Sequence, residues 1–210
     1  MRILWQRRGQ ITPPSVSPSH LVYAVQAAAG TALTIDSTRA LHRSNLRWIL
    51  ILAFAWIALD QVTKTVAEQA LKGEPAVPVL GELLQFRLVY NSGAAFSMGT
   101  GNTWVFTVLA TLVVTALVWT ARRVGHRGWA VALALLIGGA GGNLVDRLTR
   151  PPSFGQGHVV DFFALPHFPV FNVADIGISC AAVLIAVLAL RGASIEGPHH
   201  DRVDAEVEQR

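Results

Sequence analysis

Two aspartates, Asp161 and Asp175, stand among Val, Phe and Ala residues in the stretch from His158 to Ile178. A carboxylate is costly to bury in such surroundings unless it is paired or used. Repulsion and desolvation raise the pKa of one acid of a buried pair, so the pair tends to share a proton. The ionised acid can then take a proton from water while the protonated acid hydrogen-bonds to a carbonyl group. This is the chemistry of aspartic proteases.

Polar side chains elsewhere in the chain could assist such a pair. Asparagine amides and arginine guanidinium groups can orient carboxylates or stabilise a developing oxyanion. The candidates are Asn91, Asn143, Asn172 and Arg147.

The sequence also leaves structural interpretations open for these residues. Asp161 and Asp175 could cap the N-termini of helices, where aspartate is common. Asn91 could serve only the turn at Asn91-Ser92-Gly93.

Two further pairs of charged residues could have purely structural roles instead of assisting the chemistry. Asp60 and Lys64 are four residues apart, which is the spacing of a salt bridge along one helix face. Asp146 and Arg147 could form an ion pair at a membrane interface or could support the acids from behind.

The composition indicates an integral membrane protein. Of the 210 residues, 52% are hydrophobic and 14% are charged, whereas soluble domains have about 25% charged residues. The net charge is +4, but the basic residues lie beside apolar segments, where they act as topology signals, so we expect no nucleic-acid partner.

The one cysteine, Cys180, allows no disulfide, and we expect it to be a small buried hydrophobic residue. The histidines lack metal-ligand spacing and no HExxH motif is present, so a zinc protease is not expected.

Four apolar runs predict an all-α membrane protein with four transmembrane helices. Between the first two runs, prolines break the pattern and residues 84–90 alternate between apolar and other side chains, which predicts a small extramembrane sheet or hairpin over about 73–100. The glycines at 138, 139, 141 and 142 would let neighbouring helices approach closely. The predicted spans are residues 46 to about 67, 103 to about 119, 129–144 and 171–190.

The distribution of Lys and Arg predicts the orientation. The N-terminal flank, the loop 122–127 and Arg191 carry the basic residues, so both termini are expected in the cytoplasm. At about 1.5 Å of helix per residue, Asp60, Asp146 and Asp175 lie roughly 20–28 Å from these basic ends. The acids of three segments therefore converge near the outer surface, and ionisable residues at membrane depth are functional candidates.

Three domains follow from these patterns. Residues 1–44 are predicted to be a disordered cytoplasmic extension, 45–192 the membrane domain, and 193–210 a polar cytoplasmic tail.

A small transporter would also place acids in the membrane, but the repeated halves typical of transporters are not seen in the sequence. A non-catalytic membrane scaffold is the other alternative, and it would tolerate a change of the acids to amides.

Five motifs in a fixed order carry a resemblance to a known family. The chain resembles the bacterial lipoprotein signal peptidases (signal peptidase II). The motifs are DQVTK at 60–64, YNSGAAFS at 90–97, GGAGGNLVDR at 138–147, VVDFF at 159–163 and FNVADIGI at 171–178.

The resemblance implies an intramembrane aspartic endopeptidase with a small extracytoplasmic sheet over its site. Such an enzyme sits in the bacterial cell membrane with its site toward the extracytoplasmic face. It cuts prolipoproteins just before a cysteine that already carries diacylglycerol. The resemblance further implies sensitivity to globomycin, and no metal or cofactor. We expect lipidated prolipoproteins and membrane lipids as partners, and a monomer.

Residue roles carry over from the motifs. The resemblance implies that Asp161 and Asp175 are the catalytic pair. The supporting and substrate-binding residues would be Asn143, Asp146, Arg147, Asn172, Asn91, Gly93, Asp60 and Lys64. The chain departs from the family in its N-terminal extension, in a longer loop at 150–157, and in a shorter link between the two acids.

Overall fold

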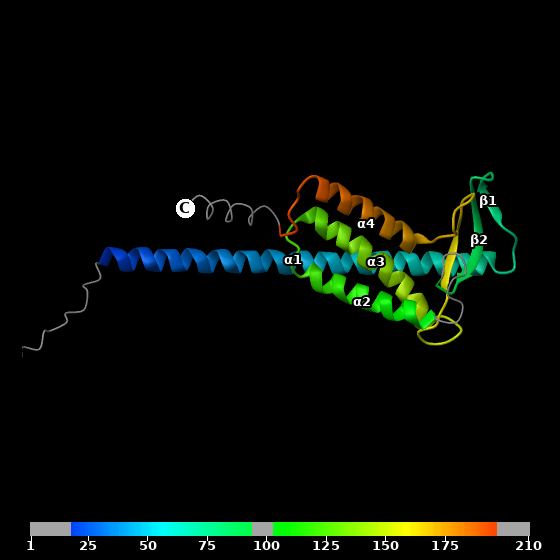
Figure 1. Ribbon diagram of the computed structural model, residues 1–210, viewed down its shortest axis with the longest axis horizontal. Coiled ribbons are helices and arrows are strands. Elements are labelled where there is room, and N and C mark those ends of the chain that lie inside the picture. The colour runs from blue at the N-terminus through cyan, green and yellow to red at the C-terminus, as the bar shows by residue number, and fades with distance from the viewer. Residues whose placement is uncertain (1–17, 94–102, 197–210) are drawn as a thin grey trace, which may run out of the picture. The chain divides into compact units, whose positions relative to one another are not determined.

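The computed structural model describes residues 18–93 and 103–196, with side chains from residue 45 onward. The chain divides into two units, Met1–Ala40 and Leu41–Arg210. In the second unit, the sheet lies at one end of the helices (Figure 1). In chain order, the four helices and three strands of the described residues are α1 (Pro18–Leu71), β1 (Val77–Leu80), β2 (Leu84–Asn91), α2 (Thr103–Ala121), α3 (Arg127–Thr149), β3 (Val159–Ala164) and α4 (Val173–Leu190).

All four predicted spans are confirmed as helices. By length and hydropathy, four segments of the described residues are able to cross a membrane: Asn45–Leu71, Thr103–Ala121, Arg127–Thr149 and Val173–Leu190. Some of these segments extend a few residues beyond the predicted limits. Helix α1 begins well before its span, in a stretch rich in alanine, which has the highest helix propensity. The domain limits predicted from the sequence stay predictions, and residues 1–17 and 197–210 lie outside the described part of the chain.

The predicted hairpin is confirmed as β1 and β2, which pair antiparallel with Val77 opposite Phe86. The segment VVDFF, for which no strand was predicted, forms the third strand, β3. It pairs antiparallel with β2 and places Asp161 opposite Val89. All residues of β3 except Phe163 are buried. Apart from Asp161 the strand is apolar on both faces, so it lacks the alternation that marks a half-buried strand.

Helix α3 is the most buried of the four spans, and glycines let it approach its neighbours. A Cβ atom at Gly139 would lie 2.4 Å from the backbone carbonyl oxygen of Ala174 on α4, and one at Gly142 would lie 2.5 Å from Oδ2 of Asp60 on α1. The predicted role of this glycine stretch is therefore confirmed. It brings α1, α3 and α4 together at the depth of the acids.

The prediction for Cys180 was wrong, because its side chain is exposed. Its neighbour Ser179 on α4 is exposed as well. An apolar run cannot reveal which face is buried, because a membrane helix is apolar on its lipid-facing side as well.

Candidate active site

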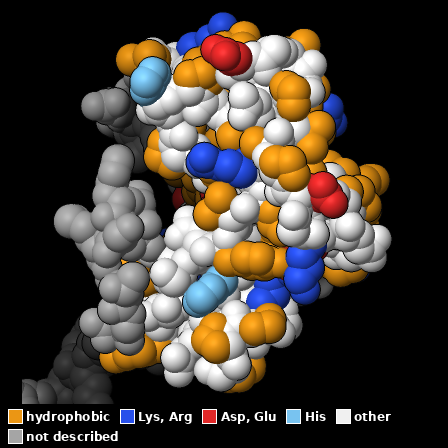
Figure 2. Space-filling view, turned by 90° about the vertical axis from the view of Figure 1, so that its right-hand side faces the viewer, with side chains coloured by type: hydrophobic (Ala, Val, Ile, Leu, Met, Phe, Trp, Pro, Cys, Tyr) orange, Lys and Arg blue, Asp and Glu red, His pale blue; other side chains and the backbone are white. Residues whose placement is uncertain are grey.

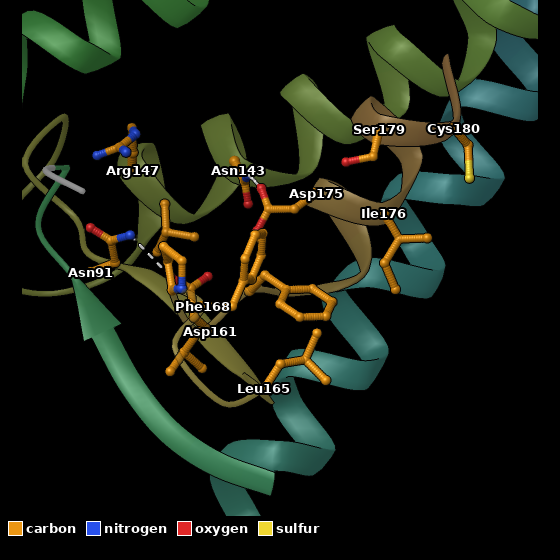
Figure 3. A pocket seen from close by; sticks show the side chains of 14 residues that line it. Asn91, Asn143, Arg147, Asp161, Leu165, Phe168, Asp175, Ile176, Ser179 and Cys180 are labelled. Atoms are coloured by element: carbon orange, nitrogen blue, oxygen red, sulfur yellow. Dashed lines mark hydrogen bonds between the residues drawn. The ribbon is translucent and has the colours of Figure 1, made fainter. Parts of the chain in front are cut away.

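Asp161 and Asp175 line one pocket with a volume of about 590 Å³. Asp161 comes from β3 and Asp175 from the first turn of α4. Figure 3 shows Asp161, Asn91 and Arg147 at one end of this pocket and Ile176, Ser179 and Cys180 at the other, with Asp175 between them. The structure therefore brings together the two acids that the sequence singled out.

Asp161 is buried and held by two amides. Its side chain is 2% exposed. Nδ2 of Asn91 donates to Oδ2 at 3.0 Å, and Nδ2 of Asn172 donates to Oδ1 at 2.6 Å. Asn91 also accepts a hydrogen bond from the backbone N–H of Gly93 at 2.9 Å. Asn91 thus both forms the predicted turn and contacts the acid.

Asp175 is held by the start of its own helix. Asn172 is the N-cap of α4 and forms a capping box with Asp175, in which each side chain accepts from the backbone N–H of the other. Nδ2 of Asn143 donates to Oδ1 of Asp175 at 2.9 Å. The helix-capping interpretation is therefore confirmed for Asp175 and wrong for Asp161, which lies within a strand.

Two asparagines join the acids. Nδ2 of Asn172 donates both to Asp161 and to Oδ1 of Asn143, the latter at 3.1 Å. Asn143 in turn donates to Asp175. The two carboxylates are thus linked through a continuous chain of amide hydrogen bonds, which limits how far either can move relative to the other.

Burial raises the pKa of Asp161 to about 6. This value is the net result of several causes: burial is the largest, the negative charge of Asp175 also raises the pKa, and the hydrogen bonds from Asn91 and Asn172 lower it. At a pKa of about 6, roughly a tenth of the molecules keep this proton at pH 7. The site thus holds a carboxyl group that can carry a proton near neutral pH.

Behind the pocket lies a fully buried ion cluster centred on Lys64. Its Nζ lies 2.7 Å from Oδ2 of Asp60 and 2.8 Å from Oδ2 of Asp146, and all three side chains are 0% exposed. Lys64 also donates to Oδ1 of Asn143 at 2.9 Å. The predicted salt bridge between Asp60 and Lys64 is confirmed, and this last contact orients the Asn143 amide so that its NH₂ group faces Asp175.

The ion cluster also holds the backbone next to each acid of the pocket. Oδ1 of Asp60 accepts from the N–H of Ala174 at 2.9 Å, and Oδ2 of Asp146 accepts from the N–H of Val160 at 3.2 Å. Ala174 and Val160 directly precede the two acids in the chain. Lys64 therefore connects, through two carboxylates, to both segments that carry the pocket acids.

Three residues of this cluster were missed by the sequence reasoning. Gln61 donates to Oδ1 of Asp146 at 3.0 Å. Nε of Arg150 donates to the same oxygen at 2.7 Å, and its guanidinium group pairs with Glu68. Helical spacing could have revealed two of them, because Glu68 lies four residues after Lys64 and Arg150 four residues after Asp146.

Arg147 does not pair with Asp146 among the ion pairs of the described residues, so the proposed interfacial pair is wrong. Its guanidinium carbon lies 5.7 Å from the centre of the Phe106 ring. Its buried Nη1 has no hydrogen-bond partner within residues 45–93 and 103–196. A Cβ atom at Gly93 would lie 2.6 Å from Cδ2 of Phe106 and 3.2 Å from that nitrogen, so the glycine leaves room for the Phe106 ring and the guanidinium group at the pocket wall.

Four helices that can cross a membrane, with two acids in a pocket at one end, define a multi-pass membrane protein with a candidate active site. A family model described as signal peptidase (SPase) II matches residues 52–191. The lipoprotein signal peptidase of Mycobacterium avium (strain 104) is 48% identical over 148 residues, which cover 70% of this chain and 81% of that protein. The enzyme of that name from Mycobacterium tuberculosis (strain ATCC 25618 / H37Rv) is 47% identical over 148 residues, covering 70% and 73%.

A solved structure agrees with these matches. A bacterial membrane enzyme determined by the in meso method at 1.9 Å resolution has a TM-score of 0.60 and 28% identity, covering 68% of this chain and 92% of that one. The chain belongs to the signal peptidase II family. It is a membrane protease that acts in lipoprotein processing by removing signal peptides, which confirms the resemblance carried by the five motifs.

Proposed function

We propose that this protein is an intramembrane aspartic endopeptidase that uses Asp161 and Asp175 as its catalytic pair. The observation that carries this proposal is that both acids line one pocket and are linked there through Asn172 and Asn143. The raised pKa of Asp161 supports it, because the mechanism needs one protonated and one ionised carboxyl group.

The proposed reaction needs one water molecule between the two carboxyl groups. The ionised acid takes a proton from this water as its oxygen attacks the scissile carbonyl carbon, and the protonated acid gives its proton to the carbonyl oxygen. The tetrahedral intermediate then collapses, the peptide C–N bond breaks, and the leaving amine receives a proton from the acid that took one from water. The second acid regains its proton from the new carboxyl group, so the pair returns to its starting state.

The neighbouring residues have positioning and binding roles in this proposal. Asn143 and Asn172 keep the two carboxyl groups in a fixed position relative to each other, and Asn91 with Gly93 forms the turn over Asp161. Arg147 offers its buried N–H group to a substrate carbonyl oxygen, since that donor has no partner among the described residues. The remaining supporting residues of the proposal are Asp60, Lys64 and Asp146, which act from behind the pocket.

The proposed substrates are prolipoproteins whose cysteine carries diacylglycerol, cut just before that cysteine. The similar proteins from Mycobacterium avium and Mycobacterium tuberculosis are lipoprotein signal peptidases, which supports lipoprotein precursors as the substrate class. The protein would act as a monomer among membrane lipids, with both termini in the cytoplasm, its site toward the extracytoplasmic face of the bacterial cell membrane, and no metal or cofactor. Globomycin is the expected inhibitor.

The surface around the sheet supports its placement at a membrane interface. Val77, Leu80 and Leu83 of the first hairpin expose between 44% and 64% of their side chains. Figure 2, which looks onto the sheet end of the second unit, shows hydrophobic side chains interspersed with Lys, Arg and His. Mixed surfaces of this kind suit the boundary between the hydrocarbon core and water.

Incubation of the purified full chain with a prolipoprotein, with and without the diacylglyceryl group, tests the proposal. We expect cleavage of the modified precursor alone, with mass spectrometry locating the cut directly before the modified cysteine. A chelator should leave the rate unchanged, and globomycin should abolish cleavage. Equal cleavage of both precursors would contradict the proposed lipid requirement, and a cut elsewhere would contradict the proposed site.

A further inference from the structure

An ion pair at the end of α1 next to the sheet lies outside the catalytic pocket. Glu68, in the last turn of α1, pairs with the guanidinium group of Arg150, the residue that directly follows α3. The side chain of Glu68 is 25% exposed and that of Arg150 is 16% exposed, and neither residue lines the pocket. The reaction proposed above does not use this pair.

One route leads from Glu68 to Asp161 through Arg150. Besides its pair with Glu68, Arg150 donates from Nε to Oδ1 of Asp146 at 2.7 Å. The other carboxylate oxygen of Asp146 accepts from the backbone N–H of Val160 at 3.2 Å. Val160 directly precedes Asp161 on β3, so the position of the Arg150 guanidinium group affects the backbone that carries the acid.

A second route leads through Tyr90. The pKa of Tyr90 is raised, first by partial burial and then by the negative charge of Glu68 and a hydrogen bond to its carboxylate. Tyr90 directly precedes Asn91, whose amide donates to Asp161 at 3.0 Å (Figure 3). Tyr90 also lies opposite Val160 in the pairing of β2 with β3. Both routes therefore end at one residue pair of the sheet, next to Asp161 and its amide donor.

We propose that Glu68 is a positioning residue for Asp161, because it contacts Arg150 and Tyr90 and through them holds both strands next to this acid. The inference rests on the proposed function, which makes Asp161 one of the catalytic pair. A partly exposed ion pair contributes little to the free energy of unfolding, whereas a small displacement of a reacting group lowers the rate strongly. Loss of the Glu68 carboxylate should therefore affect the rate of cleavage more than the stability.

Removal of the carboxylate tests this role. We expect Glu68→Ala to lower kcat for a diacylglyceryl-modified precursor by about tenfold, with KM and the melting temperature nearly unchanged because no pocket residue is altered. Glu68→Gln keeps an acceptor oxygen but loses the charge, which roughly halves the strength of a hydrogen bond, so kcat should fall only about threefold. The matched control is Glu74→Ala, at an exposed position without an ion pair or side-chain hydrogen bond among the described residues. Its kcat should stay within about twofold of the wild-type value.

A double-mutant cycle with Asn91→Ala separates positioning from other roles. Because Glu68 and Asn91 act on the same acid, the further loss caused by Glu68→Ala in the Asn91→Ala background should shrink to about threefold or less. An undiminished loss in that background would overturn the proposal. A rise in KM with unchanged kcat would indicate a direct contact with the substrate, and a lower melting temperature with unchanged kcat would indicate a purely structural role; either result would also overturn it.

Tyr90 gives a readout that needs no cleavage. The chain has two tyrosines, and Tyr23→Phe leaves Tyr90 alone. In this background, the alkaline titration of the phenol absorbance should move to lower pH in Glu68→Ala, because the negative charge that raises the pKa of Tyr90 is gone. An unchanged titration would overturn the contact between Glu68 and Tyr90. If the titration shifts as expected but the wild type does not cleave the modified precursor, the proposed function fails rather than this contact.

Discussion

Two neighbouring pairs of aspartates differ in the groups that hold them. Asp60 and Asp146 are 0% exposed and share the ammonium group of Lys64. Asp161 and Asp175 receive hydrogen bonds from amide groups, and no salt bridge to either is found among the described residues. A cation places a full positive charge beside a carboxylate, whereas amide hydrogen bonds position a carboxyl group and favour its ionised form without adding a charge. In the proposed mechanism, the same side chain therefore has a structural role in one pair and carries a proton in the other.

Removal of the cation at Lys64 should have the largest effect. Lys64→Met leaves two carboxylates buried without compensation, and breaking a buried ion pair costs about 3–5 kcal/mol. We expect a large loss of folded protein in detergent, measured by thermal unfolding and by size-exclusion chromatography. Lys72→Met, at an exposed position just after the same helix, should unfold like the wild type. A Lys64→Met protein of unchanged stability would show that the protein does not need the ion cluster for its stability.

A methyl group added between α3 and α4 should disturb the pocket acids without removing any charge. In Gly139→Ala the new Cβ atom meets the carbonyl oxygen of Ala174, directly before Asp175, at 2.4 Å. Because backbone cannot yield as a side chain can, we expect activity to fall by about 10²-fold. In Gly141→Ala the Cβ atom meets Cδ1 of Ile57 at 2.9 Å, and that flexible side-chain end can move. Similar cleavage rates for the two variants would contradict this account.

Removal of an amide from Asp161 should change the pH dependence. Asn91 donates to the ionised form and so lowers the pKa of Asp161, which means that Asn91→Ala should raise this pKa above about 6. The limb of the pH–rate profile that reports this proton should move to higher pH, with about tenfold lower activity at the optimum. A shift to lower pH would contradict the assignment. The two apparent pKa values of the profile belong to the pair rather than to single residues.

The raised pKa of Asp161 also predicts a small effect of pH on stability. The folded state binds this proton more tightly than the unfolded chain, in which the pKa is near 3.8, so the contribution is greatest below that pH and is lost as the pH rises through about 6. Asp161→Asn has no such proton. Between pH 5 and 7, the melting temperature of the wild type should therefore fall relative to that of Asp161→Asn. A relative rise would reverse the sign of the predicted linkage.

The sequence predicted the spans, the hairpin and both pocket acids, because apolar runs, alternation and misplaced charges are local signals. It did not predict β3, whose buried residues lack alternation. It also missed the partners of Asp146, since pairing with Lys64 on α1 requires the packing of α3 against α1. Contacts of this kind depend on which helix faces meet, and apolar periodicity is weak where the outer faces are apolar too.

The most direct test of the central claim is single-turnover cleavage of a diacylglyceryl-modified precursor by Asp161→Asn and Asp175→Asn, each compared with Asp60→Asn. We predict no detectable product from either pocket variant although both keep the wild-type melting profile within a few degrees, whereas Asp60→Asn loses stability but retains cleavage in the molecules that fold. Cleavage near the wild-type rate by Asp161→Asn or Asp175→Asn would contradict the account.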